Sequence, residues 1–154
     1  MQPLRDEHMG LIPQVEHLRE VADAVGEASS QGLTLALDVS LGFLTHRLYP
    51  HAHAEDRLLG GAQATASMTR DHQEIGRLTG ELYALRDTLA GRHPETTPLA
   101  DLRRVLYGTY ALVRLHFTKE EEIFLPLLDA NLSTEEAIRI FSAMGEAAKE
   151  AQAH

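Results

Sequence analysis

The chain contains no cysteine among its 154 residues. Disulfide bonds, thiolate zinc sites, iron–sulfur clusters and cysteine nucleophiles are therefore excluded, and any bound metal must be held by nitrogen and oxygen ligands. Positive charge is also scarce, because 14 Lys and Arg stand against 23 Asp and Glu, for a formal net charge of -9. This balance argues against nucleic acid or an anionic membrane surface as the main partner.

Long apolar runs are missing as well. No segment offers the ~20 apolar residues of a membrane span, and the N-terminal stretch MQPLRDEHMGL lacks the basic start and apolar run of a signal peptide. We therefore expect a cytoplasmic protein with no membrane partner. The length suits one domain with a real core, so residues 1–154 are interpreted as a single domain.

Glycine and proline gather at a few places, and the segments between them are rich in Leu, Ala, Arg and Glu. Because β-branched alternation is rare, these segments predict an all-α fold. We expect helices at about 3–28, 32–59, 63–90, 98–129 and 134–150. Four long helices with short connections pack most simply as an up-down-up-down antiparallel four-helix bundle, here about 3–129, with the short C-terminal helix outside it.

Two of these helices carry sequence signals for their first turn. Thr97 followed by Pro98 predicts an N-cap and first-turn pair at the start of the fourth helix. Ser133 with Glu136 three residues later predicts a capping box at the start of the fifth. These two starts therefore do not depend on the hydrophobic pattern alone.

Each long helix carries polar residues on its inward stripe. A helix facing a bundle core shows apolar residues at alternating steps of three and four. The fourth helix shows the pattern well, and its stripe reads Leu99, Leu102, Leu106, Thr109, Val113, His116, Glu120, Phe124 and Leu127. Each of the four helices has one histidine inward, and two add a glutamate one turn later. The inward polar residues are His8, His51, Glu55, His72, His116 and Glu120.

These residues also fall at one level of the predicted bundle. Counted from the connections at ~1.5 Å per residue, His51 lies level with His72, and His72 lies level with His116. On the first helix, His8 fits this level within about 3 Å of rise, whereas His17 misses it by roughly 10 Å and lies off the stripe. We therefore prefer His8, and His17 is the alternative.

Polar groups gathered at one level of a core need a shared partner, because burial costs several kcal/mol for each group that is neither paired nor coordinated. Imidazole nitrogen and carboxylate oxygen suit iron, manganese or zinc. Four histidines and two carboxylates fill two metal ions better than one, and carboxylates can bridge two ions. The sequence therefore predicts a binuclear metal site, with a buried polar network as the alternative.

This pattern resembles the hemerythrin-like family of HHE cation-binding domains, which carries a lone His, a His-x-x-x-Glu, a second lone His and a second His-x-x-x-Glu on successive helices. Here the motifs read DEHMGL, PHAHAEDRLL, RDHQEI and RLHFTKEEEIFLP, within about residues 4–129. The resemblance implies a four-helix bundle with two irons bridged by both carboxylates and by an oxo or hydroxo group, and it favours iron over manganese or zinc. Members bind O2, or sense oxygen, iron or nitric oxide, and some act on peroxide.

The sequence departs from the oxygen-carrying hemerythrins in two places. Gly76 stands where they have a second histidine on the third helix, and Glu120 lies four residues after its histidine, where they have an aspartate at five. Without that second histidine one iron has an open or water-filled position, which favours chemistry or other ligands over O2 storage. Glu121 is the alternative to Glu120 if the helix is wound differently there.

Three further carboxylates are candidates to orient ligand histidines through the second ring nitrogen, namely Asp56, Asp71 and Glu74.

Taken together, these features of the sequence predict a non-haem di-iron protein that binds or reacts with O2, H2O2 or nitric oxide. A regulatory iron or oxygen sensor is the second hypothesis, and a structural helical module is the third. Turnover and oligomeric state do not follow from the sequence.

Overall fold

The computed structural model describes residues 2–59 and 66–152, and every regular element in these two ranges is a helix. The predicted all-α fold is therefore confirmed. The predicted start of the third long helix, at residue 63, lies outside the described residues. Within the described part of the chain, no helix has the length and apolar character needed to cross a membrane.

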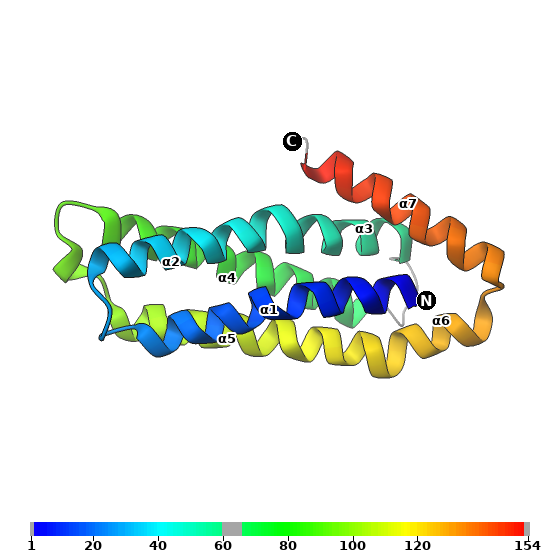
Figure 1. The fold of residues 1–154 in the computed structure, drawn as a ribbon, viewed down its shortest axis with the longest axis horizontal. Helices are drawn as coiled ribbons and strands as arrows, with labels where there is room; N and C mark the ends of the chain where they lie inside the picture. The colour runs from blue at the N-terminus through cyan, green and yellow to red at the C-terminus, as the bar shows by residue number, and fades with distance from the viewer. Residues whose placement is uncertain (1, 60–65, 153–154) are drawn as a thin grey trace.

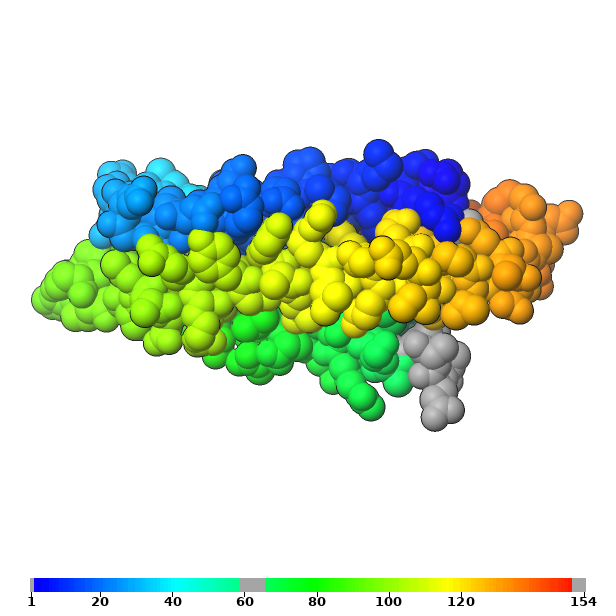
Figure 2. Space-filling model, turned by 90° about the horizontal axis from the view of Figure 1, so that it is seen from below, coloured from blue at the N-terminus to red at the C-terminus, as the bar shows by residue number. Residues whose placement is uncertain are grey.

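Four long helical rods lie lengthwise beside one another (Figure 1). The rods are α1 (Gln2–Ala24), α2 with α3 (Ser30–Phe43 and Tyr49–Leu59), α4 (Ala66–Ala90), and α5 with α6 (Leu99–Lys119 and Leu125–Asn131). Contacts join α1 to α2, α2 to α4, α4 to α5 and α5 to α1, so each rod packs against two neighbours. Figure 2 shows α1 and α5 in contact along most of their length.

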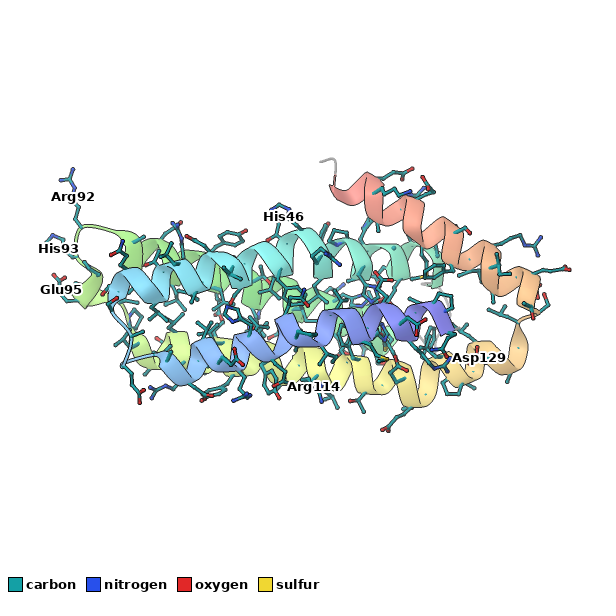
Figure 3. All side chains as sticks on the ribbon, in the orientation of Figure 1. His46, Arg92, His93, Glu95, Arg114 and Asp129 are labelled. Carbon is teal, nitrogen blue, oxygen red and sulfur yellow. The ribbon has the colours of Figure 1, made fainter. Side chains whose placement is uncertain are left out.

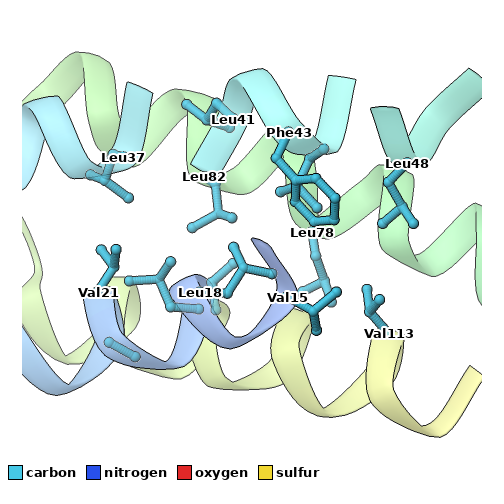
Figure 4. Packing of buried hydrophobic residues seen from close by; sticks show 14 of the residues in the cluster. Val15, Leu18, Val21, Leu37, Leu41, Phe43, Leu48, Leu78, Leu82 and Val113 are labelled. Carbon is cyan, nitrogen blue, oxygen red and sulfur yellow. The ribbon is translucent and has the colours of Figure 1, made fainter. Parts of the chain in front are cut away.

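Apolar side chains fill the space between the rods. Leu18 of α1, Leu37 of α2 and Leu82 of α4 are fully buried, and Figure 4 shows them pointing into this space. Each leucine side chain that is fully buried contributes about 1.5–3 kcal/mol to folding. The charged and polar side chains Arg92, His93 and Glu95 instead point away from the end of the bundle where α4 leads into α5 (Figure 3).

Two of the rods are each interrupted by one π-helical turn within the described residues. The turn Leu44–Leu48 lies between α2 and α3, and the turn Glu120–Phe124 lies between α5 and α6. The helices predicted at 32–59 and 98–129 are present, but their pattern did not predict these two π turns. A π turn closes i→i+5 hydrogen bonds and so inserts one extra residue, a feature that often occurs at functional sites.

The second π turn changes which residues of the last rod face inward. Before the turn, the predicted inward residues Leu102, Leu106, Thr109 and Val113 are buried, whereas Leu99, at the start of α5, is 41% exposed. Beyond the turn, however, the predicted inward Leu127 is 50% exposed, and Leu125 takes the buried position instead. The step from Glu120 to the next fully buried residue is therefore five, as the wider turn requires.

Helix ends differ from the prediction in two places. The first helix ends at Ala24 rather than near 28, because Gly26 adopts a φ of 93°, a left-handed conformation that stops a helix. At the fourth long helix, Thr97 is not the N-cap as predicted. A 3-10 turn at Pro94–Thr96 precedes it, Pro98 occupies the N-cap position, and the Thr97 side chain is buried.

The last helix, α7 (Thr134–Gln152), packs across the outside of α3 (Figure 1). The predicted capping box at its start is confirmed, since the backbone N–H of Ser133 donates to Glu136 at 2.8 Å and the N–H of Glu136 donates to Ser133 Oγ at 3.3 Å. A second apolar cluster joins α7 to the bundle, made of Leu4, Ala54, Leu125, Met144 and Ala147. This helix therefore covers the segment that carries Glu55.

Candidate metal centre

The structure brings together all six polar residues predicted to face inward. They come from α1, α3, α4, α5 and the π turn Glu120–Phe124. Five of them are buried, and His72 is partly buried as a whole residue, although its side chain is only 6% exposed. His17, the alternative to His8, lies elsewhere on α1, where its Nδ1 is 3.6 Å from Glu20. The cluster therefore contains His8 and not His17.

One half of the cluster forms around the histidines of α1 and α3. The Nε2 atoms of His8 and His51 lie 3.2 Å apart. An oxygen of Glu120, Oε2, lies 3.0 Å from Nε2 of His8, and Oε1 of Glu55 lies 3.2 Å from Nε2 of His51. Two imidazole nitrogens and two carboxylate oxygens therefore converge on one point.

The other half forms around the histidines of α4 and α5 in the same way. The Nε2 atoms of His72 and His116 lie 3.0 Å apart. The second oxygen of Glu120, Oε1, lies 3.1 Å from Nε2 of His116, and Oε2 of Glu55 lies 3.4 Å from Nε2 of His72. Each carboxylate thus contributes one oxygen to each half, which is the arrangement of a carboxylate bridge between two ions.

The donor atoms within each half are close enough to hold a metal ion. In each group of four residues the candidate ligand atoms all lie within 4.8 Å of one another. Oε2 of Glu55 and Oε2 of Glu120 are buried and accept no hydrogen bond from any residue that the structure describes. Buried carboxylate oxygens without a hydrogen bond are costly, so a cation at each half fits the residues present.

A further layer of carboxylates lies behind the histidines. At each of the four rings a carboxylate oxygen lies near Nδ1, and this contact leaves Nε2 directed at the cluster. The pairs and distances are Glu121 with His8 at 2.7 Å, Glu7 with His51 at 3.4 Å, Asp56 with His72 at 3.0 Å, and Asp71 with His116 at 3.3 Å. Hydrogen bonds to Glu121 and Asp71 therefore orient the rings of His8 and His116 from outside the cluster, and Glu7 and Asp56 lie near the rings of His51 and His72.

The structure assigns these supporting roles partly as predicted. Asp56 and Asp71, two of the three predicted supports, each lie against a histidine of the cluster. Glu74 does not, because its carboxylate accepts from Nε of Arg77 at 2.9 Å on the surface. Glu7 and Glu121 were missed. All four of these carboxylates contact a histidine of another helix, so spacing along the sequence does not predict which carboxylate meets which histidine.

Glu121, the predicted alternative to Glu120, does not face the interior of the cluster. The helix is wound differently at this point, since both Glu120 and Glu121 lie in the π turn. Glu120 nevertheless points inward and is 2% exposed, whereas Glu121 lies on the outer side of His8 and also pairs with Arg5 at 3.5 Å. The wider turn thus lets consecutive glutamates contact opposite nitrogens of one ring.

Burial and ion pairing act in opposite directions on the ionisable groups of the cluster. Burial lowers the pKa of His51, but the carboxylates of Glu55, Glu7 and Glu120 together outweigh burial and hold this pKa well above its ordinary value of 6.5. For Glu55, burial raises the pKa, but His51, His72 and His116 together outweigh burial and hold this pKa well below 4.5. Without a metal, imidazolium and carboxylate charges compensate one another, so a metal must displace protons to bind.

Phe117 is the apolar neighbour of the cluster that the sequence pattern did not single out. Its ring stacks on His8 with centroids 4.5 Å apart and an interplanar angle of 13°. It also approaches His51 and His116, at centroid distances of 6.1 and 6.0 Å. Helical spacing could have predicted its burial, because Phe117 lies one turn after the inward Val113. The predicted inward stripe was narrow, however, and continued from Val113 to His116, so it did not include Phe117.

Comparison with known protein families agrees with this geometry. The family model described as the hemerythrin HHE cation-binding domain matches residues 2–147. This range runs from the first residue of α1 into the last turns of α7 and includes all six clustered residues. Searches of curated proteins and of solved structures give no match.

Proposed function

Because the chain belongs to the hemerythrin HHE cation-binding domain family, we propose that it is an up-down-up-down four-helix bundle holding a binuclear non-haem iron centre. In this proposal the centre binds or reacts with a small oxidant, namely O2, peroxide or nitric oxide. The observation that carries it is the pair of glutamates, Glu55 and Glu120, each with one oxygen in either half of the cluster.

The donor set supports two ions rather than one. The first ion would take His8 and His51, the second would take His72 and His116, and both glutamates would be shared. Each ion would then have four donor atoms from the protein, fewer than iron usually accepts, so positions remain for small ligands. Nitrogen and oxygen donors suit manganese and zinc too, and the preference for iron rests on the resemblance to di-iron proteins.

Iron held in this way would supply electron transfer to the oxidant, and the protein supplies ligands, orientation and a dry surrounding. The outer carboxylates hold the imidazole rings in one orientation. Phe117 excludes water from the side of His8. This chemistry needs no side chain as a general acid or base.

The test is the metal content of protein produced with iron, measured by elemental analysis together with its ultraviolet–visible spectrum. About two irons per chain with charge-transfer absorption are expected, and His51→Ala or His116→Ala should lower the content to one or less. His93→Ala is the matched control, because His93 lies exposed at the end of the bundle. Less than about half an iron per chain in the unaltered protein would show that the cluster is a polar network.

A metal-dependent sensor is a second candidate, favoured by the position of α7. Ala54, next to Glu55, is buried against α7 in one cluster with Met144 and Ala147. A change in metal occupancy at Glu55 would therefore reach the α7 surface through α3. Hydrogen exchange of α7 that slows on metal loading would support this candidate, and unchanged exchange would argue against it.

A further inference from the structure

A pocket of about 520 Å³ lies between α4 and the segment formed by the first π turn and α3. His72 lines it, together with Asp56, Thr69 and Gly76. Among the six clustered residues, His72 alone lines this pocket. The half of the cluster that contains His72 therefore borders a space large enough for a small molecule.

The half of the cluster around His8 and His51 is covered differently. Phe117, itself 3% exposed, stacks flat on His8 and meets His51 edge-on. Leu4 and Leu11, about one turn to either side of His8, are also buried. Apolar packing therefore closes the space next to this half, and the two halves differ in access although their donor atoms are the same.

Gly76 lies one turn after His72 on α4 and lines the pocket. Glycine inside a helix costs about 0.5–1 kcal/mol relative to alanine, so it calls for a reason. Backbone conformation is not the reason, because Gly26 is the residue with positive φ in the described chain. Crowding is not the reason either, because a Cβ at Gly76 would meet nothing within 4 Å. The same cost and the same lack of crowding apply to Gly10, Gly42, Gly80, Gly108 and Gly145, and Gly76 differs from them in lining this pocket.

We propose that small anionic or diatomic ligands bind the metal ion held by His72 and His116, that they enter through this pocket, and that Gly76 sets the size of ligand admitted. The inference rests on the proposed binuclear centre. It assigns ligand binding to one of the two ions, and it gives Gly76 a role in specificity: the missing side chain keeps open the space beside His72.

Azide is a suitable probe, because it is a small anion whose binding to iron is followed by absorbance and needs no turnover. Gly76→Ala and Gly76→Leu add side chains of increasing size where the structure has room for them. Gly76→His would place a third imidazole one turn after His72. The matched control is Gly80→Leu, since Gly80 lies one turn further along α4 and does not line the pocket, and a Cβ at this position would also meet nothing within 4 Å.

The iron-loaded protein and the Gly80→Leu variant are expected to bind azide with the same Kd. Gly76→Leu should raise the Kd by about tenfold or more and Gly76→Ala by less, because a filled pocket discriminates by steric exclusion. Gly76→His should abolish binding, and each variant should retain the iron content of the unaltered protein. Should Gly76→Leu fold poorly, the Gly76→Ala value relative to Gly80→Leu decides the same question.

The outcomes separate this inference from the function on which it rests. Equal Kd values for the Gly76 and Gly80 variants, with iron retained, would overturn the inference and leave the binuclear centre intact. No azide binding to the iron-loaded unaltered protein would also overturn it. Failure of the unaltered protein to take up iron would overturn the proposed function, and the inference with it.

Discussion

The carboxylate of Glu121 lies 2.7 Å from Nδ1 of His8, although the two residues are 113 positions apart in the chain. Glu120, its neighbour, approaches Nε2 of the same ring at 3.0 Å. One histidine of α1 is thus held between two consecutive glutamates of a π turn in the last rod. This contact joins the N-terminal helix to the C-terminal half of the bundle through the cluster itself.

Glu121→Gln should loosen His8 without removing a ligand. We expect the affinity for metal to fall about 10- to 100-fold, the usual effect of losing an outer carboxylate. Competition with a chelator of known affinity measures this change. Glu122→Gln is the matched control, because Glu122 lies exposed in the same π turn. Equal metal affinity in the two variants would contradict the orienting role of Glu121.

Glu120→Gln should break the bridge between the two halves of the cluster. The amide nearly retains the shape of the side chain but loses the charge that approaches both His8 and His116. We expect the iron content to fall from about two per chain to one or less, because a neutral amide is a poor bridging ligand. Elemental analysis checks this, and a variant that still holds both irons would show that Glu120 is not a bridge.

The pH dependence of the metal-free protein follows from the shifted pKa values. The folded-state pKa values of His8, His51 and His72 are raised, so their stabilising effect is complete below 6.5 and is lost as the pH rises through the raised values. The pKa of Glu55 is lowered, so its effect is present above 4.5 and is lost as the pH falls through the lowered value. Urea unfolding in the presence of a chelator should therefore show a decline in stability above pH 6.5.

Metal loading should show the opposite trend with pH. Iron binds neutral imidazole, so the raised histidine pKa values mean that binding releases protons and that affinity increases with pH. Calorimetric titration in two buffers with different ionisation enthalpies measures the protons released. No proton release at pH 6.5 would argue against binding at these histidines.

A substitution in the apolar core should lower the stability of the fold without changing the metal content of the cluster. Leu82 is completely buried between the rods, and Leu82→Ala should lower the free energy of unfolding by about 2–5 kcal/mol through the cavity left behind. Leu35→Ala is the matched control, because Leu35 is 61% exposed on α2. Denaturation of the metal-free variants gives the difference. Iron content per folded chain should stay the same in both, and a loss of iron in Leu82→Ala would show that the packing and the site are coupled.

The positions of the inward histidines and glutamates could be predicted from the sequence because helical periodicity is a local property. A residue that takes the place of a leucine on a stripe must face the core, as His8, His51 and His116 do. The rise per residue then sets their level along the bundle, which was enough to prefer His8 to His17. Whether these residues bind metal remains a prediction.

Other features depended on the tertiary structure. The contacts of Glu7 with His51 and of Glu121 with His8 join different helices, and they depend on how the rods are rotated and packed. The π turns likewise leave no clear mark in a pattern of steps of three and four, although one of them exchanges Leu127 for Leu125 on the inward face. Sequence periodicity determined which face of each helix is inward, because it needs one helix only. Packing decided the partners of each ring nitrogen and the difference in access between the two halves, because these require the neighbouring helices to be in place.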